Sequence, residues 1–292
     1  MVGEERQELS RVNCPEDAEQ GSPRAGWGWY LYGITTTKYP EAAGLAHGIG
    51  LDGRAPLQVF TRGEVAGVVS RVPLAEFGIE AVRVHGDDPA WLEAAVRAHE
   101  RVVAEIHRLG TVVPAKFGCV YASIEDLLEA LESRQEALLE RLGGLDGCDE
   151  WGIRLYADRK CVAATAAKGH PAVRDLADEL RTASPGRAFF LRRKLADSLA
   201  AATEQSLSDL AQAGYDHLAE LAVAAQLGDR SGSPSASEEP EILRAAFLIR
   251  RTSGEAFVEE VRGFVAGHEG VRCEYSGPWP PYSFVTLGEE IR

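Results

Sequence analysis

The chain has 292 residues, 45% of them hydrophobic and 26% charged, a composition typical of a soluble globular protein with about two hydrophobic cores. Its formal net charge of −14 opposes binding to nucleic acid or to an anionic membrane surface. The sequence has no run of about 18 apolar residues and no signal-peptide core at its start, so we expect a cytoplasmic protein.

A first domain is expected to follow a polar N-terminal arm. Residues 1–26 have too few apolar side chains to offset the entropy lost on ordering, which predicts a disordered arm. Residues 27–147 predict an N-terminal α+β domain. It begins with an aromatic and β-branched strand at 27–34, and a hairpin is expected over 57–70, where Gly63 permits the turn.

Two helices are predicted later in this first domain. Asp88 is placed to cap the first helix, whose apolar residues recur every three or four positions, and Gly110 is expected to end it in a left-handed conformation. The second helix is expected to begin with a capping box formed by Ser123 and Asp126 and to stop at 143–144.

Residues 148–292 predict a C-terminal α+β domain that opens with an alternating strand at 150–156. Helical segments interrupted by a proline at 169–171 follow it, and one long helix is expected over 188–227. Residues 228–240 are rich in serine, glycine and proline, which predicts a mobile linker.

The remaining elements set the fold class. A continuous apolar strand is expected at 242–249, a helix with a capping box formed by Thr252 and Glu255 after it, and an alternating strand at 271–276. This order of strands and helices predicts an α+β protein of two domains. The C-terminal domain is expected to be a modified ferredoxin-like fold with a long helix.

The sequence contains little that indicates catalysis. Gly48–Gly53 matches G-x-G-x-x-G, but Pro56 follows soon after it, where a nucleotide-binding loop requires a helix. We interpret the segment as a plain glycine loop, with a phosphate-binding loop as the alternative. No Walker loop, nucleophile elbow or H-E-x-x-H motif is present. We therefore expect no enzyme, and no catalytic, cofactor-binding or metal-ligating residues.

His99 and the cysteines have structural interpretations. His99 lies on the apolar stripe of the first helix, which favours a hydrogen-bonded core histidine over a buried switch or a ligand. The five cysteines are an odd number without a C-x-x-C pair, which predicts reduced thiols.

A segment rich in proline and aromatic residues lies near the C-terminus. We expect Trp279, Tyr282 and Phe284 to fold back and seal the core of the second domain, because each ring can bury about 150 Å² or more. The alternative is that Pro278 and Pro281, which match P-x-x-P, form an exposed polyproline ligand.

Seven blocks of the chain, taken in order, resemble the GvpF/GvpL family of gas vesicle proteins. They are Trp29–Ile34, Val65–Ser70, Val113–Gly118, Glu150–Arg154, Gly186–Arg192, Ala245–Leu248 and Gly277–Phe284. The sequence departs from the family pattern at Lys116, where arginine is expected, at Cys119, where threonine is usual, and at Phe189–Phe190. The F-like and L-like members of the family are not separated by these blocks.

The resemblance implies a minor gas vesicle component without catalytic activity. It implies contacts with the small hydrophobic shell protein and with other accessory vesicle proteins, and a location in the cytoplasm and the gas vesicle, including the gas-facing side of the shell.

The resulting hypothesis is an accessory protein that acts by binding during gas vesicle assembly. The residues expected to contact other proteins are Trp279, Tyr282, Phe284, Phe189 and Phe190. The alternatives are a small-molecule-binding enzyme or sensor with a ferredoxin-like domain, and a generic adaptor that uses Pro278–Pro281.

Overall fold

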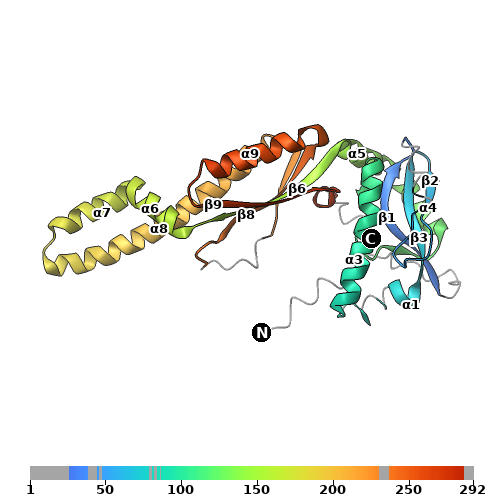
Figure 1. Cartoon of the computed structure of the whole chain (residues 1–292), viewed down its shortest axis with the longest axis horizontal. Coiled ribbons are helices and arrows are strands. Elements are labelled where there is room, and N and C mark those ends of the chain that lie inside the picture. Colours follow the sequence, from blue (N-terminus) through green and yellow to red (C-terminus); the bar gives the residue numbers. More distant parts are fainter. Residues whose placement is uncertain are drawn as a thin grey trace. The chain divides into compact units, whose positions relative to one another are not determined.

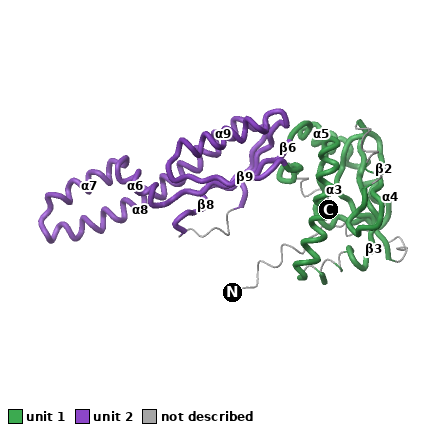
Figure 2. Tube along the Cα trace, viewed as in Figure 1, with its two compact units in different colours: residues 1–148, 279–292 green, residues 149–278 purple. Residues whose placement is uncertain are grey.

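The computed structural model describes residues 26–38, 45, 48–78, 81, 84–85, 87–229 and 237–285. The expected N-terminal arm, apart from Gly26, and the centre of the expected linker lie outside these residues. The chain forms two compact units (Figure 2). Unit 1 contains residues 1–148 and 279–292, and unit 2 contains residues 149–278. The expected second domain and unit 2 therefore differ at the C-terminal end, where the chain returns to unit 1.

Unit 1 is built on a five-stranded sheet with the strand order β2-β3-β1-β4, in which β5 also pairs with β1. Its strands are β1 (Trp27–Thr36), β2 (Gln58–Arg62), β3 (Val65–Pro73), β4 (Val113–Pro114) and β5 (Val120–Tyr121). The predicted hairpin is confirmed, because β2 and β3 pair antiparallel and Gly63 takes a φ of +58° in the turn.

Helices cover both faces of this sheet (Figure 1). They are α1 (Leu74–Phe77), α3 (Pro89–Leu109), α4 (Ile124–Ser133) and α5 (Gln135–Leu145). Val102 and Ile106 of α3 pack with Tyr32 on one face of the sheet. On the opposite face, Leu127 and Leu131 of α4 lie against the backbone of β3 at Gly67.

The predicted starts of the two long helices are confirmed. The Asp88 carboxylate accepts hydrogen bonds from the backbone N–H groups of Ala90 and Trp91, at 3.0 and 3.4 Å. Ser123 and Asp126 form the predicted capping box, with both reciprocal hydrogen bonds at 3.1 Å.

The first helix ends before Gly110 as predicted, but the predicted left-handed conformation of Gly110 and the unbroken course of the second helix are wrong. Gly110 is extended, with φ −179°, because the chain passes directly from α3 toward β4 and needs no left-handed turn. The second predicted helix is divided at Arg134, whose φ of −121° and ψ of 12° break the helical backbone, and 143–144 lie within α5.

A buried polar network joins β1 to α3. The hydroxyl of Tyr30 lies 3.0 Å from Nδ1 of His99 and accepts a hydrogen bond from the Gly118 N–H at 2.9 Å. The Tyr30 proton is therefore free to be donated to His99. Only 1% of His99 is exposed, and its ring stacks on that of Tyr32. The prediction of a hydrogen-bonded core histidine is confirmed.

The glycine loop at Gly48–Gly53 supports the same network. Its Leu51 N–H donates to the hydroxyl of Tyr32 at 2.6 Å, and Tyr32 and Ser70 share a hydrogen bond at 2.8 Å. A Cβ atom on Gly50 would lie 2.3 Å from Oγ of Ser70, so the close approach requires glycine. Strand β2, and no helix, follows the loop. This geometry supports the interpretation as a plain glycine loop.

Unit 2 is built on a four-stranded sheet with the order β7-β8-β6-β9. Its strands are β6 (Cys148–Ala157), β7 (Ala224–Leu227), β8 (Glu241–Arg250) and β9 (Val271–Trp279). Its helices are α6 (Arg159–Gly169), α7 (Pro171–Thr182), α8 (Pro185–Ala219) and α9 (Gly254–Ala266). The order of these elements is β6-α6-α7-α8-β7-β8-α9-β9, and the description of the unit as a modified ferredoxin-like fold stays a prediction.

Only part of α8 packs on this sheet. Leu207 and Leu218 of α8 belong to the core that Phe247 and Phe257 also build. The earlier turns of α8 pack against α6 and α7 around a small cluster centred on Ala166, Val173 and Ala202. We call α6, α7 and residues 185–203 of α8 the helical arm; they run side by side at one end of unit 2 (Figure 1).

Two predictions in unit 2 are wrong. The long helix ends at Ala219, and Ala224–Leu227, expected to be helical, forms an edge strand paired antiparallel with β8. The capping box of Thr252 and Glu255 is absent, because a 3-10 turn at Arg251–Ser253 precedes α9 and the Ser253 side chain caps nothing.

The buried histidine predicts how unit 1 responds to acid. Burial lowers the pKa of His99 from 6.5 to about 4, and the backbone of Ala115 opposes this only in part. Below about pH 6.5 His99 is protonated in the unfolded chain but stays neutral in the folded chain. The free energy of unfolding therefore falls as the pH drops from 6.5 toward 4, by about 3 kcal/mol in total.

This loss is expected to be smaller in His99→Asn, which keeps an acceptor for Tyr30 but does not titrate. Urea unfolding at a series of pH values measures the difference between the two proteins. Parallel stability curves for the wild type and the variant would show that His99 does not contribute.

Candidate functional site

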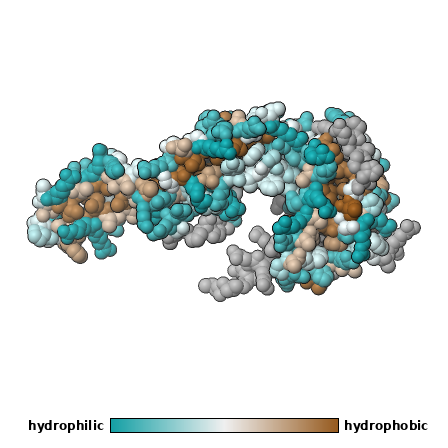
Figure 3. All heavy atoms as spheres, in the orientation of Figure 1, coloured by the Kyte–Doolittle hydropathy of each residue, from teal (hydrophilic) through white to brown (hydrophobic). Residues whose placement is uncertain are grey.

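The most exposed aromatic pair in the described structure lies on the helical arm. Phe189 and Phe190 are 68% and 74% exposed, and their rings contact each other edge to face with centroids 5.7 Å apart. The neighbouring Ala188 and Leu191 are buried, so α8 turns one side inward and presents both rings on the other. Figure 3 shows hydrophobic atoms gathered over the helical arm among hydrophilic ones.

Three cations follow the aromatic pair along α8. Arg192, Arg193 and Lys194 are exposed, and none of them has an ion-pair partner among the residues that the structure describes. Arg187, one turn earlier, differs from them because it pairs with Glu179 of α7. The aromatic rings are thus bordered by positive charge that the arm itself does not neutralise.

Tyr282 has a structural position in unit 1. It lies in the 3-10 turn Tyr282–Phe284 and packs against the core of unit 1. Burial raises the pKa of the Glu100 carboxyl on α3, and interaction with the Tyr282 side chain opposes this rise only in part. The prediction that Tyr282 seals the core of the second domain is wrong, because the chain leaves β9 and packs on the first core instead.

The two other residues of this segment remain partly accessible. Trp279, the last residue of β9, is 52% exposed. Phe284 is half-buried, and its carbonyl accepts a hydrogen bond from Arg141 at 3.4 Å. Pro281 is buried and Pro278 lies within β9, so the exposed polyproline ligand of the adaptor hypothesis is not formed.

The five predicted contact residues therefore do not form one site. Phe189 and Phe190 belong to unit 2, whereas Trp279, Tyr282 and Phe284 are grouped with unit 1. The three cations at 192–194 were not predicted as part of a site. Their signal in the sequence was the position of Arg-Arg-Lys directly after Phe-Phe-Leu in a strongly acidic chain.

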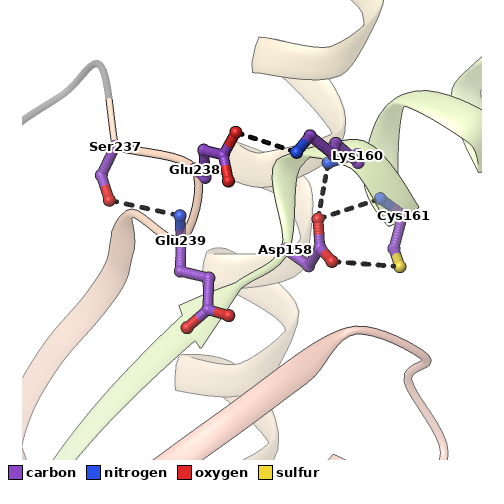
Figure 4. Close-up of polar contacts among 6 residues, drawn as sticks. All are labelled: Asp158, Lys160, Cys161, Ser237, Glu238 and Glu239. Carbon is purple, nitrogen blue, oxygen red and sulfur yellow. Dashed lines mark hydrogen bonds and ion pairs between the residues drawn. The ribbon is translucent and has the colours of Figure 1, made fainter.

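A cluster of ionisable groups at the start of α6 has a capping role (Figure 4). Asp158 accepts hydrogen bonds from the backbone N–H groups of Lys160 and Cys161 at 2.7 and 3.3 Å, and Lys160 pairs with Glu238 at 2.8 Å. The Cys161 sulfur lies 3.5 Å from Oδ2 of Asp158, and this contact raises the pKa of the thiol. Because the thiolate is the reactive form, this geometry disfavours a nucleophilic cysteine.

A wide cleft of about 700 Å³ opens in unit 2 beside the start of α9, with Trp151 and Pro278 among the residues that line it. Four of its five charged groups form two ion pairs, and Glu255, the fifth, also lines the cleft. Arg251 contacts Asp149 at 2.9 Å, and Arg262 pairs with Glu259 and donates to Tyr275 at 3.1 Å. These pairs satisfy most of the charged groups of the cleft, whereas the buried Nε1 of Trp151 has no hydrogen-bond partner among the described residues.

Two further features bear on function. Within the described ranges, no cluster of three or more histidine, cysteine or acidic residues is arranged to hold a metal ion. No helix in the described part of the chain has the length and apolar character needed to span a membrane.

Comparisons with known proteins all identify gas vesicle proteins as similar to this chain. A family model described as "Gas vesicle synthesis protein GvpL/GvpF" matches residues 28–286. Gas vesicle protein L of Streptomyces sp. (strain CB03234) is 32% identical in an alignment of 276 positions that covers 89% of this chain and 94% of that protein. Gas vesicle protein F of the same organism is 28% identical, with 88% and 98% covered.

Solved structures share the fold. The crystal structure of GvpF from Anabaena sp. PCC7120 aligns with a TM-score of 0.61 at 20% identity, covering 90% of this chain and 97% of that one. GvpF from Microcystis aeruginosa aligns with a TM-score of 0.57, also at 20% identity, covering 89% and 99%. The α+β fold expected from the sequence is confirmed by these alignments.

The different positions of Tyr282 and Trp279 predict different effects on stability. Tyr282→Ala removes a ring packed on the core of unit 1 and is expected to lower the free energy of unfolding by about 2–4 kcal/mol. Trp279→Ala removes a half-exposed ring and is expected to change it by less than about 1 kcal/mol. Chemical denaturation of both variants measures the difference, and a larger loss for Trp279→Ala would contradict the assignment.

Proposed function

The chain belongs to the GvpL/GvpF family of gas vesicle proteins, and we propose that it acts in gas vesicle assembly by binding the small hydrophobic shell protein and other accessory vesicle proteins. In this proposal it has no catalytic activity. The family match over residues 28–286 supports a role in gas vesicles, and the arrangement of exposed side chains supports action by binding.

The physical need for such a protein follows from the chemistry of a shell that faces gas. A shell subunit must carry a large apolar surface, and before assembly that surface promotes aggregation in water. A partner with a net charge of −14 stays soluble while it covers part of the apolar surface. The proposed protein would bind the shell subunit until the growing vesicle takes it up.

The exposed pair Phe189–Phe190 is the observation that carries this proposal. Two adjacent phenylalanine rings are exposed to water on the helix surface, and this exposure does not stabilise an isolated monomer. Aromatic residues are frequent at the centres of protein interfaces. The neighbouring apolar residues Ala188 and Leu191 are buried. The helix therefore has a buried side at this point, and both phenylalanine rings lie on the exposed side.

Trp279 is proposed as a second contact, because half of its ring is exposed beside the turn at Tyr282–Phe284. Tyr282 and Phe284 contribute to it mainly by holding this segment on unit 1. We extend the proposal to a location in the cytoplasm and the gas vesicle, with the aromatic contacts directed at the gas-facing side of the shell.

A pull-down of co-expressed shell protein tests the proposal. The full-length chain is expected to retain the shell protein, and Phe189→Ser/Phe190→Ser is expected to retain at least about tenfold less, as for the loss of a central aromatic contact. Trp279→Ala is expected to weaken retention to a smaller degree.

Leu221→Ser/Leu227→Ser is the matched control, because it also removes two exposed apolar side chains from unit 2. Circular dichroism of each variant checks that it is folded. Equal retention by the wild type and a folded Phe189→Ser/Phe190→Ser variant would reject the aromatic pair as the contact. Normal vesicles in a host that lacks the gene would reject the role in assembly.

A further inference from the structure

The outward side of α8 combines rings and charges in a regular pattern. Phe189 and Arg193 are four residues apart, and so are Phe190 and Lys194. Residues four apart on a helix lie on the same side, one turn above the other. The surface therefore consists of two neighbouring rows, each with a phenylalanine followed by a cation. We call these four residues the aromatic–basic face.

Among the residues that the structure describes, no carboxylate forms an ion pair with the cations of this face. Asp197, one turn further along α8, forms no ion pair with Arg193 or Lys194 in the described structure, and the first turn of α8 contains no acidic residue. Acidic residues would stabilise that end of the helix, where the dipole is positive. Adjacent cations without counter-charges repel each other, so the arrangement does not serve the stability of α8.

An acidic partner would supply the opposite charge. A surface with two apolar rings and two cations at helical spacing is complementary to a helix that carries carboxylates beside an apolar stripe. Contacts between such groups set orientation and specificity, because a like-charged partner is excluded.

Two acidic helices of a second copy of this chain, α4 and α9, do not supply such a surface. Helix α4 buries its apolar residues Leu127 and Leu131 in unit 1, and α9 buries Phe257 and Val261 in unit 2. These helices present carboxylates to solvent without an apolar stripe.

We infer that the aromatic–basic face of α8 docks an acidic amphipathic helix of the partner protein, with partner carboxylates against Arg193 and Lys194 and partner apolar side chains against Phe189 and Phe190. The inference rests on the proposed binding of the shell protein and names the chemistry of the partner segment that this surface selects.

Charge reversal tests the inference with the co-expressed shell protein as the probe. Arg193→Glu/Lys194→Glu leaves both rings in place and is expected to lower the amount of retained shell protein by about tenfold. Arg193→Lys/Lys194→Arg keeps both charges and is expected to retain the wild-type amount. Raising the salt from roughly 0.05 to 0.5 M is expected to weaken binding by the wild type.

The matched control is Lys168→Glu/Arg174→Glu, which makes the same change in net charge at exposed positions of α6 and α7. It is expected to leave retention within about twofold of the wild type, because neither residue belongs to the aromatic–basic face. Circular dichroism confirms that each variant is folded.

The outcomes separate this inference from the proposed function. If Phe189→Ser/Phe190→Ser loses the shell protein but Arg193→Glu/Lys194→Glu keeps it, the proposed function stands and the acidic partner helix is rejected. Binding of the wild type to phosphatidylglycerol vesicles through the same residues, or concentration-dependent self-association lost on charge reversal, would also overturn the inference. If the wild type retains no shell protein, the inference and the proposed function fail together.

Discussion

A helix of 35 residues is longer than the sheet that it covers, and this mismatch determines the architecture of unit 2. At 1.5 Å per residue α8 extends about 52 Å, whereas the ten-residue strands β6 and β8 extend about 33 Å. The turns of α8 beyond the sheet need other apolar cover, and α6 and α7 provide it. Their narrow packing covers one side of α8 only, which leaves Phe189 and Phe190 accessible on the other.

Most features specified by neighbouring residues were predictable, although the capping box of Thr252 and Glu255 was predicted wrongly, and features that depend on distant partners were missed. The caps at Asp88 and Ser123 follow from side-chain chemistry within four residues, and both were found from the sequence. Ala224–Leu227 has the composition of a helix and becomes a strand because β8 offers it backbone partners. Tyr282 was assigned to the wrong core because an aromatic ring does not encode which of two apolar interiors receives it.

The same distinction applies to the candidate site. Phe189 and Phe190 were selected from the sequence as contact residues, but their exposure required the structure, since Ala188 and Leu191 in the same turn are buried. The contribution of Arg193 and Lys194 was missed, because a basic run in a charged protein is usually paired within the fold. What distinguishes these cations is that no carboxylate among the described residues pairs with them, and only coordinates reveal that.

The path of the chain after β9 makes unit 2 an insertion within unit 1. The backbone leaves unit 1 near residue 148 and rejoins it at residue 279, so the two units are joined by two covalent crossings. A truncation just before Trp279 would consequently remove the Tyr282 ring from the core of unit 1. Unit 2, which directly precedes the cut, would keep all of its core residues. Removal of unit 2, by contrast, would require a linker that joins residue 148 to residue 279, so that unit 1 remains one continuous chain.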